Sequence, residues 1–378
     1  MIFVMSGVLL ARFVLYSAAP QAIALPADEW SNQRECSAPL CLMSPDSFRY
    51  GALTTFALAT GVNRNPETVL KEMTQYEVRL RATRDGVFFS YVSALLAKKA
   101  GLPATAANSV IELLGAVLGA LVLRDLFIRL GLSAHWLIGA ALSPVFTLYG
   151  NINLKEAWDV TFFLVLVYAI MTLGRGRRAL LLLVLCLFSL WVLYYDRTYY
   201  ILLALFVGLA DRVVSEPARS RRTIGYAMLA GIAVAAYELP GLDIYRSYRT
   251  VSGGRELLRA VAHTMLDPIG LHNNLFQYIV LAMTLPVFMT YLVVLFRPLV
   301  EFRTRRTEAA LRWARRGWMW VLTFVVVVIV ASRAQGSGFE RGRDAFAPLL
   351  LIGAAMLGRR RSESDSNPRV DEWVDIHA

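Results

Sequence analysis

The sequence alternates between long apolar stretches and short connectors rich in arginine. Hydrophobic residues make up 57% of the chain and charged residues only 18%, below the share of about 25% typical of soluble domains. A helix that crosses a bilayer needs roughly 20 apolar residues. The pattern therefore predicts an all-α, polytopic transmembrane helical bundle of about ten spans, at 1–25, 104–123, 133–150, 155–173, 179–195, 198–214, 222–241, 275–296, 317–332 and 344–358.

The arginine-rich connectors predict the orientation of these spans, because cytoplasmic loops carry an excess of Lys and Arg. Arginines cluster on alternate connectors and after the last span, at 124–129, 175–178, 212–222, 297–316 and 359–361. This arrangement predicts a multi-pass protein of a bacterial inner (plasma) membrane with both termini in the cytoplasm. It also accounts for the net charge of +11 without nucleic acid as a partner.

The predicted topology divides the chain into a transmembrane domain, 1–358, and a polar cytoplasmic tail, 359–378, expected to be disordered. Within the first part, 27–103 forms a large extracytoplasmic loop. Two partly apolar stretches in this loop, 48–61 and 87–100, are too short to span a bilayer and are flanked by charge. They are expected to be helices lying at the membrane surface.

The N-terminal region leaves two alternatives open. Residues 22–24 are Ala-Ile-Ala, which resembles a signal-peptidase site, but no basic segment precedes them and Arg12 interrupts the apolar stretch. We interpret 1–25 as an uncleaved span. Cys36 and Cys41 lie in the outer loop, where a disulfide between them is chemically feasible.

The segment 44–50 is the first of four polar clusters at the predicted outer face. Asp46 could cap the helix that follows, or its carboxylate could act as a general base toward an acceptor hydroxyl or hold a metal ion. Arg49 in the same segment is a candidate substrate contact.

The second cluster, 151–159, opens a predicted span with three ionisable residues. Lys155 and Asp159 are four residues apart and share a helix face, where they could simply pair. Glu156 lies in the first turn, where the helix dipole favours an acid. Charged residues are costly in a membrane helix, so all three are also candidate substrate-binding residues.

The third and fourth clusters add arginines to the same face. Asp196 and Arg197 lie in a very tight turn within a tyrosine-rich segment, and Arg197 is a candidate phosphate contact. The glycine-rich segment 332–348 carries candidate phosphate contacts that could equally belong to a solvated loop, namely Arg333, Arg341 and Arg343. Two charges lie inside predicted spans: Glu112 and Arg12 are expected to pair with each other or to reach toward the membrane surface.

At these residues the chain resembles the GT-C-type integral membrane glycosyltransferases, the group that includes protein mannosyltransferases and aminoarabinose transferases. Polysaccharide polymerases share several of the features. The motifs are Pro-Asp-Ser-Phe-Arg-Tyr at 45–50, Ser-Pro-Val-Phe at 143–146 with Asn-Leu-Lys-Glu-Ala at 153–157, Asp-Arg-Thr-Tyr at 196–199, and Arg341 and Arg343 with Pro348.

The resemblance implies a polyprenyl-phosphate-linked sugar as donor, with its lipid between the membrane helices. Asp46 would then orient or deprotonate the acceptor, while Arg197, Arg341 and Arg343 stabilise the leaving phosphate. The resemblance does not identify a cofactor, and a divalent metal ion is left open. The alternatives are an O-antigen- or exopolysaccharide-type polymerase or ligase, and a transporter or flippase of lipid-linked intermediates, which should carry its polar groups at the bilayer midplane rather than at one rim.

Overall fold

The structure, a computed structural model, describes residues 45–81, 86–132, 143–147, 155–172, 179–215, 314–326 and 345–358, together with a few single positions between 223 and 289. Regular secondary structure in this part of the chain is entirely helical, which confirms the predicted all-α class there. The helices are α2 (Pro45–Thr60), α3 (Pro66–Arg81), α4 (Val87–Ala100), α5 (Ala104–Arg129), α7 (Pro144–Thr147), α8 (Glu156–Thr172), α9 (Ala179–Asp196), α10 (Thr198–Ser215) and α17 (Ala347–Gly358), with a further helical segment at 314–326.

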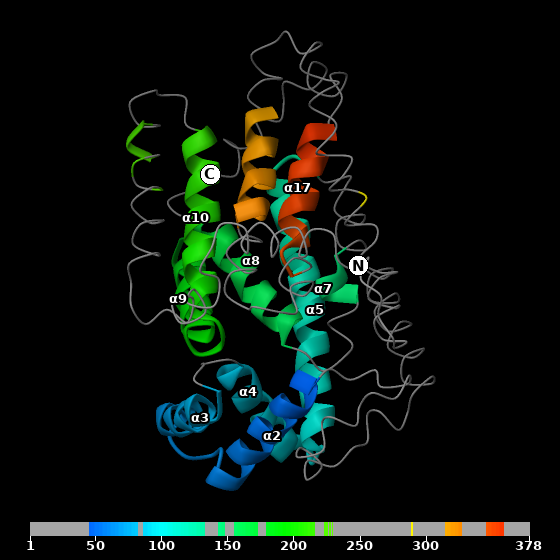
Figure 1. Cartoon of the computed structure of the whole chain (residues 1–378), viewed down its shortest axis with the longest axis vertical. Helices are drawn as coiled ribbons and strands as arrows, with labels where there is room; N and C mark the ends of the chain where they lie inside the picture. The colour runs from blue at the N-terminus through cyan, green and yellow to red at the C-terminus, as the bar shows by residue number, and fades with distance from the viewer. Residues whose placement is uncertain are drawn as a thin grey trace, which may run out of the picture.

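Helices α2, α3 and α4 lie together at the end of the molecule from which α5 rises (Figure 1). Helices were predicted at 48–61 and 87–100, and α2 and α4 confirm both. Helix α3 was missed because its sequence is mostly polar and only one narrow face, which includes Val69, Leu70 and Met73, is buried. We call α2, α3 and α4 the crosswise unit.

Two glycines define the ends of α4. Gly86 precedes the helix with φ of 73° and Gly101 follows it with φ of 64°, both in the left-handed region that favours glycine. The backbone N–H of Gly101 donates to the carbonyl of Ala97 and so closes the last turn. The chain then enters α5 after two residues, so the C-terminal end of α4 is tied directly to α5.

Helices α5 and α8 run in the same direction and touch along glycines. A Cβ atom placed on Gly115 of α5 would lie 2.8 Å from the Cα of Trp158 on α8, and one on Gly119 would lie 2.4 Å from Thr161 Oγ1. The Thr161 hydroxyl also donates to the Gly115 carbonyl at 2.7 Å. Small residues that let two backbones approach in this way are typical of helix pairs in membranes.

The helices after α8 alternate in direction (Figure 1). Helix α10 runs parallel to α8, since Arg197 just before α10 meets Glu156 at the start of α8, and Gly208 meets Ile170 further along both helices. Helix α9 joins α8 to α10 in sequence and runs the other way, with Asp196 at its end beside Lys155 at the start of α8.

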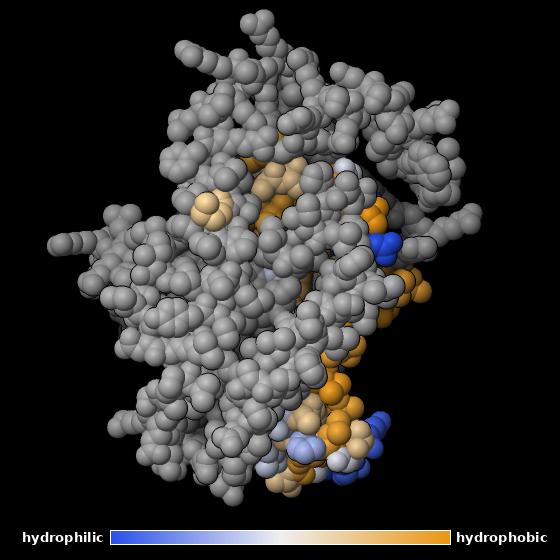
Figure 2. Space-filling view, turned by 90° about the vertical axis from the view of Figure 1, so that its right-hand side faces the viewer, coloured by the Kyte–Doolittle hydropathy of each residue, from blue (hydrophilic) through white to orange (hydrophobic). Residues whose placement is uncertain are grey.

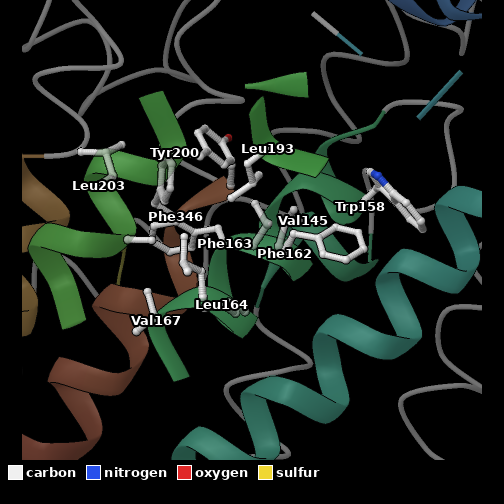
Figure 3. Close-up of a cluster of buried hydrophobic side chains, with 14 of the residues drawn as sticks. Val145, Trp158, Phe162, Phe163, Leu164, Val167, Leu193, Tyr200, Leu203 and Phe346 are labelled. Carbon is white, nitrogen blue, oxygen red and sulfur yellow. The ribbon is translucent and has the colours of Figure 1, made fainter. Parts of the chain in front are cut away.

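The segment 314–326 lies antiparallel to both α10 and α17. Arg316 at its start binds Asp211 near the end of α10, and Gly317 approaches Met356 and Leu357 near the end of α17. At the other end of α17, Phe346 packs against Phe163 and Tyr200. These aromatic rings belong to the buried apolar cluster that joins α8, α10 and α17 (Figure 3).

By length and composition, two of the described helices could cross a bilayer: α5 and α10. The segments Leu180–Asp196 and Ala347–Leu357 are apolar but shorter. Five described helical segments fall within a few residues of the predicted spans, at α8, α9, α10, 314–326 and α17. The segment 124–129, predicted as a connector, is instead the last part of α5. The arrangement of ten spans stays a prediction, because several of them lie outside the described residues.

Exposed apolar side chains cover one face of α9 in particular. Leu180, Leu181, Val184 and Leu187 are each more than half exposed, and Trp191 extends the same surface toward the end of the helix.

In the space-filling view, the described surface that faces the viewer is largely apolar, with hydrophilic residues toward its lower end and at one point higher up (Figure 2).

Candidate functional site

Five of the candidate residues come together where the crosswise unit meets the bundle. Lys155, Glu156 and Asp159 belong to the start of α8, whereas Asp196 and Arg197 form the turn between α9 and α10. All five are buried, with relative exposure between 0% and 8%. The sequence placed them in two separate clusters, and the parallel course of α8 and α10 unites them. We call this group, together with Glu112 described below, the rim network.

Ion pairs connect the members of this network. Lys155 Nζ lies 2.9 Å from Asp159 Oδ2, which confirms the pairing considered for residues four apart on α8. Arg197 Nη2 lies 3.1 Å from Glu156 Oε1, and Arg197 Nε lies 3.3 Å from Asp159 Oδ2. Asp159 therefore lies between both cations, and the α9–α10 turn is held on the first turn of α8.

Arg197 uses all three of its guanidinium nitrogens within the protein. Besides the two carboxylates, its Nη1 donates to the hydroxyl of Tyr200 at 3.0 Å. A phosphate group at this position would have to compete with groups that already neutralise the guanidinium. The predicted role of Arg197 as a phosphate contact stays a prediction, while its observed contacts are those of a residue that holds helices together.

Asp196 caps the beginning of α4, a helix more than one hundred residues earlier in the chain. Its Oδ1 accepts the backbone N–H of Phe88 at 2.7 Å, and its Oδ2 accepts that of Phe89 at 3.1 Å. These amides lie in the first turn, where an α-helix has N–H groups without partners in the helix and where its dipole favours negative charge. Asp196 thus takes the place of an N-cap side chain that Gly86 cannot supply.

Lys155 supports the contact between Asp196 and α4 through the backbone of Asp196. Its Nζ donates to the backbone carbonyl of Asp196 at 3.0 Å, in addition to its ion pair with Asp159. Its aliphatic stem lies so close to Gly86 that a Cβ there would be 2.9 Å from Lys155 Cδ and 2.4 Å from the ring of Tyr50. The start of α4 is therefore seated directly on Lys155 and Tyr50.

Glu112 joins the network from α5. Its Oε1 accepts the backbone N–H of Ala157 at 3.1 Å, so this fully buried carboxylate caps the start of α8. The sequence led us to expect that Glu112 would pair with Arg12 or reach toward the membrane surface. Arg12 lies outside the described residues, so its pairing with Glu112 stays a prediction. The observed contact of Glu112 is with the first turn of a neighbouring helix.

The position of Glu112 also divides α5 into two parts. From Glu112 to Arg129 the helix has 18 residues and is about 26 Å long at 1.5 Å per residue, close to the thickness of a bilayer core. The preceding turns pack against the crosswise unit, where Asn108 accepts a hydrogen bond from Thr54 of α2 at 2.8 Å. The rim network thus lies at the starts of α8 and α10 and contacts α5 in the first half of that helix.

Carboxylates outnumber cations in the rim network. Among the described residues, the four carboxylates of Glu112, Glu156, Asp159 and Asp196 lie with the two cations of Lys155 and Arg197. These six groups have a formal charge of −2 when all are ionised. The N-termini of α4 and α8 offset part of this charge, since each carries roughly half a positive charge. Among these residues the balance therefore stays negative, so this group does not itself favour a further anion.

Asp46 lies in the first turn of α2, which begins at Pro45, and Arg49 follows at the start of the second turn. The side chain of Asp46 lies outside the described part of the structure. Arg49 forms a buried ion pair with Glu77 of α3, and its guanidinium carbon lies 5.4 Å from the ring centre of Tyr50. Arg49 thus ties α2 to α3, and its predicted contact with substrate stays a prediction.

The remaining predicted site residues, Arg333, Arg341 and Arg343, lie outside the described residues, as do Cys36, Cys41 and the predicted cytoplasmic tail. Among the described residues, no group of three or more His, Cys, Asp or Glu side chains is arranged to hold a metal ion. No family model matches the sequence, and no curated protein or solved structure is significantly similar to it.

Proposed function

We propose that the chain is an integral membrane glycosyltransferase of the GT-C type. It would transfer a sugar from a polyprenyl-phosphate-linked donor to an acceptor at the extracytoplasmic face, in the synthesis of cell-envelope glycans. The observation that carries the proposal is the location of the rim network: buried charged residues gather at one end of an apolar helical bundle, where a unit of short helices that begins next to Asp46 packs across it.

The opposite end of the bundle supports the membrane orientation. Arg129 ends α5, Arg212 lies in the last turn of α10, and Arg315 and Arg316 begin the segment 314–326. Because α5 and α10 run parallel to α8 while 314–326 runs against α10, these arginines share the end far from the rim network. Arginine at that end is what the positive-inside rule requires of the cytoplasmic face.

The chemistry would use residues at the rim. The acceptor hydroxyl would give its proton to Asp46 while its oxygen forms a bond to the anomeric carbon of the sugar. The bond from that carbon to the phosphate oxygen would break, and polyprenyl phosphate would leave with the electron pair. Negative charge grows on this phosphate, so arginines placed around it favour the transition state over the ground state.

The contacts within the rim network leave fewer candidate residues for binding the leaving phosphate. Lys155 and Arg197 are neutralised by carboxylates, so we assign the leaving phosphate to Arg341 and Arg343, with Arg333 as a further candidate. In sequence, Arg343 precedes Phe346 by three residues, and Phe346 packs on Tyr200 at the rim end of α10. Lys155, Glu156, Asp159, Asp196 and Arg197 would then act by holding the helices that surround the substrate.

A transporter of lipid-linked intermediates is the less favoured alternative. Such a protein should bind its cargo near the bilayer midplane, often with broken helices there. Among the described helices, Glu112 is the charged residue nearest the middle of a predicted span, 104–123. Its contact with Ala157 makes it part of the rim network. A polymerase or ligase would use the same chemistry with a lipid-linked acceptor.

The proposal is tested by replacing Asp46 and Arg341 in a strain that lacks the gene and analysing its cell-envelope glycans by mass spectrometry. Asp46→Asn and Arg341→Ala should abolish product formation while expression and membrane insertion persist. Matched controls at the other end of the bundle, Asp125→Asn and Arg315→Ala, change exposed residues of the same types and should keep the product. Full activity in both rim variants would falsify the proposed site.

A further inference from the structure

The three helices of the crosswise unit are joined by contacts of their own. Arg49 of α2 pairs with Glu77 of α3, and Phe56 stacks on Tyr76 with ring centres 4.2 Å apart. Tyr50 meets Phe89 of α4 edge to face at 5.7 Å. These contacts join α2 to α3 and α2 to α4, so the three helices can be treated as one body. That body packs against α5 through both α2 and α4, and the hydrogen bond from Thr54 to Asn108 joins α2 to α5.

Helix α4 is attached at both of its ends, but in different ways. Its C-terminal end continues into α5 through the turn that begins at Gly101, whose φ is 64°. Its N-terminal end is held across the chain by the two carboxylate oxygens of Asp196. Beside that contact, Phe88 packs on Trp191 of α9 with ring centres 4.7 Å apart, a contact without the directional constraint of hydrogen bonds. Gly101 therefore corresponds to a hinge and Asp196 to a latch.

We infer that Asp196, with Lys155 behind its backbone carbonyl, is the latch that fixes the crosswise unit on the bundle and thereby sets the position of the first turn of α2. Because that turn contains Asp46, the inference gives Asp196 and Lys155 a positioning role in the reaction, and this part rests on the proposed function. A carboxylate suits the task because it accepts both amides of α4 while its charge matches the positive end of the helix. Without it, the start of α4 would lose these hydrogen bonds and keep only its packing contacts with α5 and α9.

The latch is tested on the purified full-length protein by measuring distances between paired spin labels in a cysteine-free background. One label replaces Lys98, exposed on α4, and the other replaces Leu187, 57% exposed on α9. A second pair, Leu118 on α5 and Leu187, reports on the bundle itself. Asp196→Ala should broaden or shift the distance distribution of the first pair by several ångströms and leave that of the second pair unchanged.

A matched control is available at the far end of the bundle. Asp211 is also buried and accepts hydrogen bonds from Arg316 and Trp320, but it joins α10 to 314–326 and does not touch the crosswise unit. Asp211→Ala should leave the first label pair unchanged. Asp196→Glu, which keeps the charge, should restore a narrow distribution. The inference is overturned if Asp196→Ala leaves the first pair unchanged, if both pairs change together, or if Asp211→Ala moves the first pair equally.

A second variant covers the case in which Asp196→Ala does not fold. Gly86→Ala places a methyl group against Tyr50 and Lys155 and should lift the start of α4 without removing any charge. It is expected to shift the first label pair in the same way, and an unchanged distribution would count against the latch. Since these distances need no substrate, the latch can hold or fail independently of whether the protein transfers sugar.

Discussion

The two ends of the bundle are stabilised by buried charge in different ways. At one end, the rim network joins α4, α5, α8 and the α9–α10 turn through six charged residues that are at most 8% exposed. At the other end, Asp211 and Arg316 form a pair with two hydrogen bonds of 2.6 and 2.7 Å, and the Arg316 side chain is 24% exposed. The second arrangement is an ion pair between α10 and the segment 314–326, of a kind that any helical bundle could use. We call this pair of Asp211 and Arg316 the clasp.

The specialised structure lies at the end of the bundle that holds the rim network. A buried charge is costly unless it is paired, and removing one partner leaves the other uncompensated. The rim network brings four carboxylates together with two cations and two helix N-termini, where an apolar core would be simpler to build. We infer that these buried polar residues are present because α2, α4, α8 and α10 must be held in a fixed arrangement around a site. At the far end, the helices only need to pack against each other.

The largest loss of stability is expected on removing the ammonium group of Lys155, which contacts both Asp159 and the backbone of Asp196. Lys155→Met should lower the free energy of unfolding by about 3–5 kcal/mol, because Asp159 loses a buried partner and the Asp196 carbonyl loses a donor. Arg316→Met should cost less, roughly 1–3 kcal/mol, since water reaches the clasp. Denaturant titration in detergent micelles measures both. Equal losses at the two ends would contradict the distinction drawn between them.

Glu112 offers a sharper test of the charge excess at the rim. Glu112→Gln keeps an oxygen for the Ala157 amide and removes one negative charge from a network with excess carboxylate, so stability should change by less than about 1 kcal/mol or rise. Glu112→Ala leaves the amide unsatisfied beside a cavity and should cost about 2–4 kcal/mol. Thermal unfolding of the two variants decides the point. An equally large loss for both variants, which share only the loss of the carboxylate charge, would mean that the charge itself is needed.

Glycine substitutions test whether the two ends differ in packing as well as in charge. An added Cβ would come within 2.8 Å of Trp158 Cα at Gly115, and within 2.9 Å of the Gly317 carbonyl oxygen at Gly353. Gly115→Ala and Gly353→Ala should therefore cost similar amounts, about 1–3 kcal/mol each. Gly51→Ala is the control, because its nearest neighbour would be 3.7 Å away and it lies within α2. If Gly115→Ala and Gly353→Ala differed widely, close packing would also distinguish the ends.

The sequence predicted the helical class and most described helix positions because apolar length is a strong and local signal. It failed where the determining contact is not local or not apolar. Helix α3 has only a narrow buried face, so it did not stand out from the polar loop around it. The end of α5 was taken for a connector because Arg124, Asp125 and Arg129 are charged, although these residues are good or tolerable helix formers in an exposed last turn.

The rim network was predicted in its members but not in its contacts. Lys155 with Asp159 follows from their spacing of four, yet the sequence offers no sign that Asp196 would meet α4 or that Glu112 would meet α8, because these partners are 107 and 45 residues apart. One signal was available and not used: Gly115 and Gly119 form a G-x-x-x-G motif in an apolar stretch, which indicates close packing against another helix. That motif, with Glu112 one turn before it, would have marked the face of α5 that receives α8.

The two ends of the bundle are also expected to face opposite sides of the membrane. This prediction can be tested with substitutions that are not expected to change stability. Asn63, exposed between α2 and α3, and Asp125, exposed near the end of α5, lie on opposite sides of the rim network along the bundle. In single-cysteine variants, a membrane-impermeant maleimide added to intact spheroplasts should label Asn63→Cys at once and Asp125→Cys only after permeabilisation. The reverse pattern would place the rim network at the cytoplasmic face. Lipid-linked donors displayed on the outer leaflet could not reach it there, and the assignment as an extracytoplasmic glycosyltransferase would be lost even if every contact in the network were correct.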